Sequence, residues 1–173
     1  MKLRVLDDFK ALKGKRVLLR TDFNVPIARG RIGADEDWRL RRVVPTIEKL
    51  RKAGARVVIA THLGRPEGRK VASLKLDAVA KRLSQLVHAP VEKLPDCVGV
   101  EVEEAIAAMK DGQVVMLENL RFRKGEEEND LPFAEALSRL ADVYVDEAFG
   151  VSHRAAASNV GVTRYLPSYA GPL

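Results

Sequence analysis

RVLLRTDFNVP, residues 16–26, joins a short apolar run to a polar loop. The apolar part, residues 16–20, follows a turn at Gly14 and is typical of a buried strand. Similar apolar runs predict further strands at residues 56–60, 114–117 and 143–145, and Val91 begins a shorter one. The stretch therefore predicts a sheet whose strands end in polar, chemically useful loops.

Helical spacing of apolar residues separates these strands. It predicts helices over residues 39–50, 76–87, 102–109 and 133–140. Asp37 is a candidate N-cap for the first helix and Asp130 for the last. Pro45, inside the first helical pattern, predicts a kink or a late helix start. We expect residues 124–130 to form a solvated loop, and residues 158–173 to form a loop or short helix followed by irregular chain.

Strands that alternate with helices at this spacing favour right-handed βαβ units. The predicted fold is an α/β, Rossmann-like three-layer sandwich, with a mainly parallel central sheet and helices on both faces. The sequence contains no internal repeat, low-complexity tract or linker, so we expect residues 1–173 to form a single domain.

The composition excludes several protein classes. An apolar fraction of 46% argues against a disordered chain, and no apolar run approaches the roughly 20 residues of a membrane span. The first eight residues lack the apolar core of a secretory signal. A single cysteine, Cys97, forms no internal disulfide and fits a reducing compartment. We expect a cytoplasmic monomer with no membrane partner.

The net charge of +6 favours anionic partners. Nucleic-acid binders concentrate their basic residues and add stacking aromatic residues, whereas here the aromatic residues are scattered and basic residues alternate with acidic ones. Small phosphorylated anions are therefore favoured over nucleic acid, which we do not expect as a partner.

Polar residues follow each of the four main predicted strands. In an open parallel sheet, ligands bind beyond the carboxyl ends of the strands. Arginines stand in three of these four loops, and guanidinium groups match phosphate oxygens bidentately. The residues expected to share one pocket there are Arg65, Arg121, Arg154, His62 and His153.

Other interpretations apply to individual residues. His62 could be a structural cap, and Glu118 could cap a turn rather than act as a base. Cys97 is expected to be buried as a small apolar residue, and Trp38 to be a packing anchor. We expect Arg20 to pair with Asp22 or a neighbouring acid.

Several motifs are missing from the sequence. It contains neither a Gly-x-x-x-x-Gly-Lys-Ser/Thr nor a Gly-x-Gly-x-x-Gly motif, and it has no ligand cluster at metal-binding spacing. We therefore expect this chain to bind no nucleotide cofactor and no metal.

Four segments together resemble the phosphoglycerate kinase family, in the order and spacing typical of its N-terminal half. They are RTDFNVP (20–26), THLGRP (61–66), LENLRF (117–122) and the segment AFGVSHRA (148–155). The resemblance implies a transferase of glycolysis that moves a phosphoryl group reversibly between 1,3-bisphosphoglycerate and ADP. It also implies that this chain is the N-terminal, 3-phosphoglycerate-binding half. The C-terminal nucleotide-binding domain, which would bind Mg-ATP or Mg-ADP, is expected to lie outside it, so the chain is expected to be inactive alone.

The resemblance also assigns roles to individual residues. Asp22 and Asn24 would contact the glycerate hydroxyl and carboxylate, and Arg39, as the catalytic residue, would lie nearest the migrating phosphoryl group. The non-transferred phosphate would be bound by His62, Arg65, Arg121 and Arg154 together with the loop residues Leu63 and Gly64. Phe23 and His153 would support the site.

Four positions differ from the family pattern. Asp146–Glu147 stands in place of Asn-Asp, Val151 in place of Thr, and Ala156 in place of a second His. The differences at Asp146–Glu147 and Ala156 keep open a non-catalytic module that kept the fold and binds another anion or a protein. The net charge of +6 keeps open a second alternative, a nucleic-acid binder.

Overall fold

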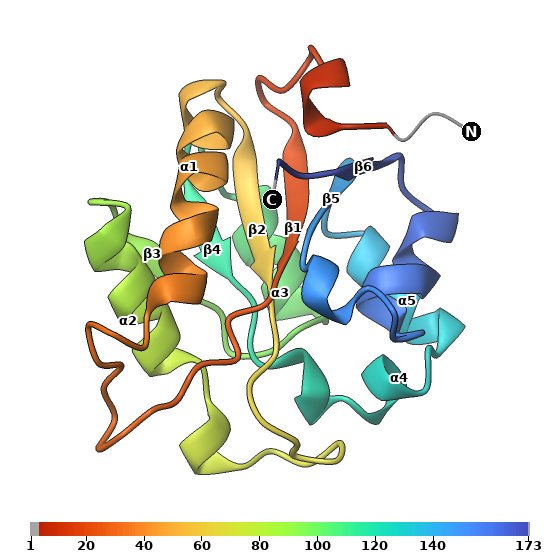
Figure 1. Cartoon of the computed structure of the whole chain (residues 1–173). Coiled ribbons are helices and arrows are strands. Elements are labelled where there is room, and N and C mark those ends of the chain that lie inside the picture. Colours follow the sequence, from red (N-terminus) through yellow and green to blue (C-terminus); the bar gives the residue numbers. More distant parts are fainter. Residues whose placement is uncertain (1–3, 173) are drawn as a thin grey trace.

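The computed structural model describes residues 4–172, which form one six-stranded parallel sheet between two helical layers (Figure 1). The strands are β1 (Arg16–Thr21), β2 (Arg56–Ala60), β3 (Val91–Lys93), β4 (Val114–Met116), β5 (Val143–Glu147) and β6 (Ser168–Ala170). The helices are α1 (Trp38–Lys52), α2 (Asp77–Leu86), α3 (Val100–Ala107), α4 (Lys124–Glu127) and α5 (Leu131–Ser138).

The sheet order is β3-β4-β2-β1-β5-β6, and all the strand pairs are parallel. β1 lies between β2 and β5, where Arg20 is in register with Ala60 and Asp146. The carboxyl ends of these three strands therefore lie side by side. The α/β sandwich predicted from the sequence is confirmed.

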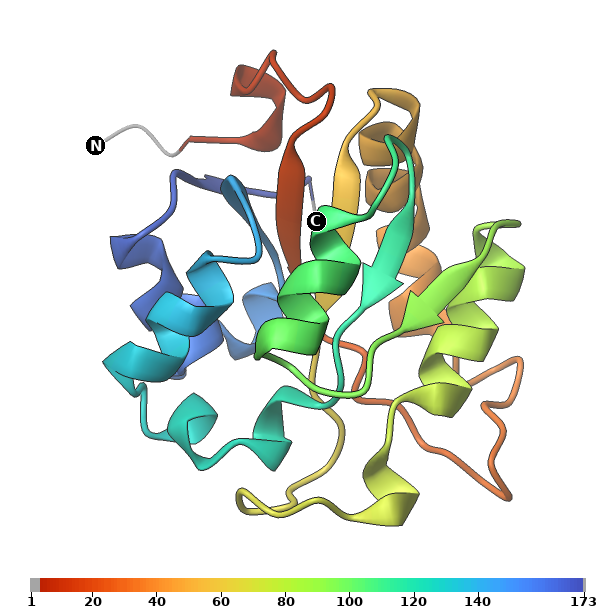
Figure 2. The same ribbon diagram turned by 180° about the vertical axis from the view of Figure 1, so that it is seen from behind.

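Alternate residues of each strand point into different cores. On one face of the sheet, Leu19 and Ile59 pack with α1 and α2, and on the other face Leu18 and Val58 pack with α3 and α5. Figure 2 shows α3 and α5 covering the face that is hidden in Figure 1. Both faces of the sheet are buried, which explains the continuous apolar runs of the strands.

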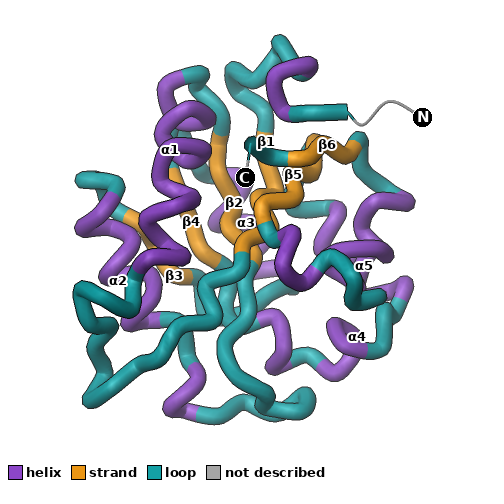
Figure 3. Tube along the Cα trace, viewed as in Figure 1, coloured by secondary structure: helices purple, strands orange, loops and turns teal. Residues whose placement is uncertain are grey.

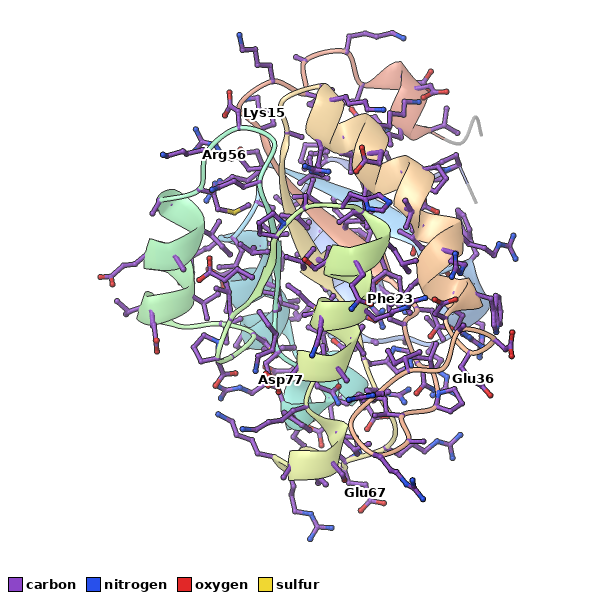
Figure 4. The ribbon with its side chains drawn as sticks, turned by 90° about the vertical axis from the view of Figure 1, so that its left-hand side faces the viewer. Lys15, Phe23, Glu36, Arg56, Glu67 and Asp77 are labelled. Carbon is purple, nitrogen blue, oxygen red and sulfur yellow. The ribbon has the colours of Figure 1, made fainter. Side chains whose placement is uncertain are left out.

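The loops that follow the strands gather at one end of the sheet (Figure 3). Figure 4 marks the two ends: Lys15 and Arg56 lie at the amino ends of β1 and β2, and Glu67 lies on the loop after β2 at the opposite end. Among residues 4–172, no helix is both long enough and apolar enough to cross a membrane.

Two expectations about local structure are wrong, and one of the two alternatives for Pro45 is excluded. α1 begins at Trp38 and continues through Pro45, so the late helix start is excluded. Residues 124–127 form α4, and the Glu126 side chain in this expected solvated loop is buried. Residues 168–170 form β6, which extends the sheet beside β5, while Leu173 lies outside the described residues.

These errors share a cause, which is that distant contacts override the local pattern. Glu126 is buried because Ser158, 32 residues away, donates to its carboxylate. β6 is placed by its pairing with β5 and by a bridge between Ala170 and Val5. Trp38 is also not the expected packing anchor, because half of its surface is exposed and the Arg39 guanidinium lies 4.9 Å from its ring centre.

Candidate anion-binding site

Two neighbouring cavities open at the carboxyl ends of the strands. The smaller one has a volume of about 240 Å³ and is lined by Arg20, His62, Arg121, Glu126, Glu127, Val151, Arg154, Ala155, Ala156 and Asn159. The larger one, of about 400 Å³, is lined by Asp22, Trp38, Arg39, Arg42, Val43, Glu147, Ala148, Phe149 and Gly150. The volume of the larger cavity alone falls within the range of about 300–1,000 Å³ that is typical of small-molecule sites.

The smaller cavity has an excess of positive charge. Three arginines and two glutamates line it. Arg121 is mostly buried, and its Nε lies 3.3 Å from Glu127 Oε1. Arg154 is exposed and forms no ion pair with any residue that the structure describes. The Arg154 guanidinium therefore lies at the opening of the cavity without an ion-pair partner, and it can bind an anion there.

His62 is a neutral side chain in this cavity. Burial, followed by the nearby cations Arg20, Arg121, Arg154 and Arg39, lowers the pKa of His62 to about 2. Its Nε2 lies 3.9 Å from Asp22 Oδ1, which is too long for a hydrogen bond. Because the imidazole is uncharged, this contact is not an ion pair.

Asp22 and Arg39 form an ion pair in the larger cavity. Asp22 follows β1 directly and Arg39 is the second residue of α1, so the pair joins the start of the loop after β1 to the helix that follows this loop. Beside them, the buried carboxylate of Glu147 accepts a hydrogen bond from Thr46. The pair holds the Arg39 guanidinium in the larger cavity.

A buried asparagine shapes the loop after β2. Asn119 accepts hydrogen bonds from the backbone N–H groups of Leu63 and Arg121, and its Nδ2 donates to the carbonyls of Leu63 and Leu74. These contacts fix the loop at Leu63 and Gly64, next to His62.

Gly64 receives two further contacts in this loop. Its N–H donates to Asn24 Oδ1 at 2.9 Å, and its carbonyl accepts from Arg121 Nη1 at 2.7 Å. Its φ of +62° and the 2.8 Å that would separate a Cβ from Leu74 Cδ2 explain why glycine occupies this position. The loop thereby links Asn24 to Arg121.

The structure brings together only part of the expected set of site residues. His62, Arg121 and Arg154 line the smaller cavity, and Asp22 and Arg39 line the larger one. Asn24, Leu63 and Gly64 line neither cavity but take part in the hydrogen bonds of the loops after β1 and β2. Phe23 is fully buried in the core and lines neither cavity, so its supporting role stays a prediction. Arg65 and His153 are exposed and belong to neither lining.

Sequence reasoning missed several residues of the smaller cavity. Arg20 pairs with Glu126 at 3.8 Å rather than with Asp22. Glu126, Glu127 and Asn159 were not singled out for the site. The available signal was Arg20 itself, a charge at the end of an otherwise apolar strand. As expected, Cys97 is buried and the Glu118 carboxylate accepts from the backbone N–H of Asn119.

Known proteins resemble this chain closely. The family model described as phosphoglycerate kinase matches residues 6–173. The chain is 55% identical over 162 residues to a phosphoglycerate kinase of Dictyoglomus turgidum, and 50% identical over 171 residues to one of Borreliella afzelii. These alignments cover 94% and 99% of this chain but only 40% and 43% of the two relatives.

Solved structures agree with the sequence comparisons. Phosphoglycerate kinase from Coxiella burnetii is 37% identical, with a TM-score of 0.87 over 99% of this chain and 42% of that one. The enzyme from Pyrococcus horikoshii OT3 is 36% identical, with a TM-score of 0.86 over 98% of this chain and 42% of that one. The chain spans about two fifths of the length of these relatives, and it belongs to the phosphoglycerate kinase family.

Proposed function

We propose that this chain is the phosphoglycerate-binding, N-terminal part of a phosphoglycerate kinase, and that its two cavities hold 3-phosphoglycerate or 1,3-bisphosphoglycerate. The observation that carries the proposal is the smaller cavity, where an unpaired Arg154 and the neutral donor His62 stand beside Arg121. A phosphate ester supplies the negative charge that the unpaired Arg154 lacks and an acceptor for the hydrogen bond that His62 can donate.

We assign the bound molecule as follows. The non-transferred phosphate occupies the smaller cavity, against His62, Arg121 and Arg154, and Arg65 adds its charge from outside. The glycerate carbons extend toward Asp22 and Asn24. The reacting carboxyl end then lies near Arg39, in the larger cavity.

This arrangement gives the protein a role in positioning and charge neutralisation. The acceptor of phosphoryl transfer is already a carboxylate, so no general base is required. Arg39, held by Asp22, would face the negative charge of the migrating phosphoryl group.

Transfer to ADP also requires a nucleotide and its magnesium ion. Among residues 4–172, no group of three or more His, Cys, Asp or Glu side chains is placed to hold a metal. We propose that Mg-ATP and Mg-ADP bind to a second domain, which corresponds to the part of the relatives that this chain does not span. We also propose that this chain alone does not catalyse phosphoryl transfer. A cytoplasmic location and a monomeric state stay predictions.

Titration calorimetry with 3-phosphoglycerate tests the proposal. Saturable binding that weakens with salt is expected, and Arg154→Ala should weaken it by about 1.5–3 kcal/mol, or roughly 10- to 150-fold. Arg65→Ala is expected to weaken it in the same direction. Arg164→Ala is the matched control, because Arg164 is also exposed but lies outside both linings. If the chain binds another anion or a protein but gives no heat with 3-phosphoglycerate, the substrate assignment is wrong.

A further inference from the structure

A buried arginine lies in the wall of the smaller cavity. Arg20 is only 2% exposed, and its Nε donates to Ser158 Oγ at 2.8 Å. Its Nη1 donates to the carbonyl of Thr21, and its Nη2 lies 3.2 Å from Nδ1 of His62. A guanidinium has donors and no acceptor, so the Nδ1 atom that faces it must be the acceptor. The neutral imidazole then carries its proton on Nε2.

Two further side chains orient this guanidinium. Glu126 Oε1 accepts from the Ser158 hydroxyl at 2.6 Å, and its Oε2 accepts from the Ser158 backbone N–H at 3.0 Å. The hydroxyl proton of Ser158 is thereby used by Glu126, which leaves the oxygen lone pairs of Ser158 to accept from Arg20. Glu126 also provides the opposite charge, at 3.8 Å from Arg20 Nη2. Arg20 thus donates to both Ser158 and His62, and Ser158 donates to Glu126, so that the four side chains form one connected network.

The other ring nitrogen, Nε2, lies on the edge of the imidazole away from Arg20, toward Asp22 of the larger cavity. His62 lines the smaller cavity beside Arg121 and Arg154, while Asp22 lies 3.9 Å from Nε2 and does not accept its proton. An Nε2–H group at this wall can donate to an anionic oxygen. The opposite tautomer would instead present a lone pair to the anion, and the two would repel.

We propose that Glu126, Ser158 and Arg20 are positioning residues that set the tautomer of His62, so that it offers Nε2–H as a neutral hydrogen-bond donor to the bound phosphate ester. The assignment rests on the proposed function for the identity of the ligand, but the tautomer is a property of the ligand-free chain. The local sequence does not reveal this role, because Arg20, Glu126 and Ser158 come from β1, α4 and the turn at 157–161.

Nuclear magnetic resonance tests the tautomer directly. Long-range ¹H–¹⁵N correlation spectra of the ligand-free chain are recorded between pH 5.5 and 8, and the His62 signals are identified by their loss in His62→Gln. The expected result is a protonated Nε2 and an unprotonated Nδ1 throughout this range. A protonated Nδ1, or a ring that becomes charged within the range, would overturn the proposal.

Two variants test the positioning role. Arg20→Lys keeps the charge but loses the fork that reaches Ser158 and His62 together, and Ser158→Ala removes the acceptor for Arg20 Nε. Each should give a mixture of His62 tautomers and weaken 3-phosphoglycerate binding by about tenfold. Ser152→Ala is the matched control, since Ser152 donates to Asp146 and contacts neither Arg20 nor His62.

The outcomes separate the two proposals. Ser158→Ala removes only a hydroxyl, so it decides the question if Arg20→Lys fails to fold. A single unchanged tautomer in Ser158→Ala refutes the positioning role, even if binding weakens. Absence of 3-phosphoglycerate binding by the native chain refutes the proposed function, whatever tautomer the spectra show.

Discussion

Replacing Asn119 by alanine should destabilise the loop that carries His62 more than replacing an exposed residue that contacts the same loop. Asn119 is fully buried and makes four hydrogen bonds, to the N–H and carbonyl of Leu63, the N–H of Arg121 and the carbonyl of Leu74. Their lengths are between 2.8 and 3.2 Å. The alanine side chain has no hydrogen-bond donor or acceptor, so these backbone groups would lose their partner.

The magnitude follows from the count of lost contacts. At about 1 kcal/mol net for each hydrogen bond, the four together contribute about 4 kcal/mol to the free energy of unfolding. That is a large part of the roughly 5–15 kcal/mol typical of a folded protein. With a urea slope of about 2 kcal/mol per molar, the unfolding midpoint should fall by about 2 M.

Asn24→Ala is the control for this experiment. Asn24 contacts the same loop, but through one exposed hydrogen bond to the N–H of Gly64, so its loss should cost about 0.5–1 kcal/mol. Both variants are compared by equilibrium unfolding in urea, followed by circular dichroism. A midpoint for Asn119→Ala no lower than that for Asn24→Ala would show that the buried amide does not hold the loop.

Three further predictions concern conformation, pH and ligand detection. Gly64→Ala should lower the free energy of unfolding by about 2–3 kcal/mol, and Gly30→Ala by only about 1 kcal/mol. Both glycines have a positive φ, but an added Cβ would meet Leu74 only at Gly64. Urea unfolding of the two variants measures the difference. The pKa of His62 is lowered to about 2 in the folded chain, so below pH 6.5 the unfolded chain binds a proton that the folded chain does not. The free energy of unfolding of the native chain should therefore fall by about 1.4 kcal/mol per pH unit, relative to that of His62→Gln, as the pH falls from 6.5. Parallel pH dependences of the two proteins would contradict a neutral, buried imidazole. Trp38 is the only tryptophan of the sequence and lines the larger cavity. Binding of 3-phosphoglycerate should therefore change the fluorescence of the native chain but not that of Trp38→Phe. An unchanged spectrum of the native chain at saturation would place the ligand away from that cavity.

The layered fold could be predicted because its signals are local. Each strand is a short apolar run and each long helix repeats its apolar positions, so residues near one another in the chain define the element. The N-cap at Asp130 is of this kind, since its carboxylate accepts from the N–H of Phe133 three residues later. The parallel order of these elements then placed the polar loops at one end of the sheet.

The site was harder to predict because its polar contacts are distant in sequence. Glu126 lies among acidic residues that resemble a solvated loop, yet its buried carboxylate faces Ser158 and Arg20. Trp38 beside a charged run was expected to pack inward, yet it lies half exposed beside Arg39. In each case the deciding neighbour comes from another element, and a pattern along one segment does not contain it.

The charges of the site divide into two classes with different expected effects. Arg20, Arg39 and Arg121 each face a carboxylate, of Glu126, Asp22 and Glu127 respectively. Arg154 forms no ion pair with any described residue, so its charge remains available to a ligand. Since an uncompensated, exposed charge is screened by salt more than a buried pair, loss of Arg154 should reduce the salt dependence of anion binding. Loss of Arg20 should instead weaken binding at every salt concentration, because its contribution is the orientation of His62 rather than long-range attraction.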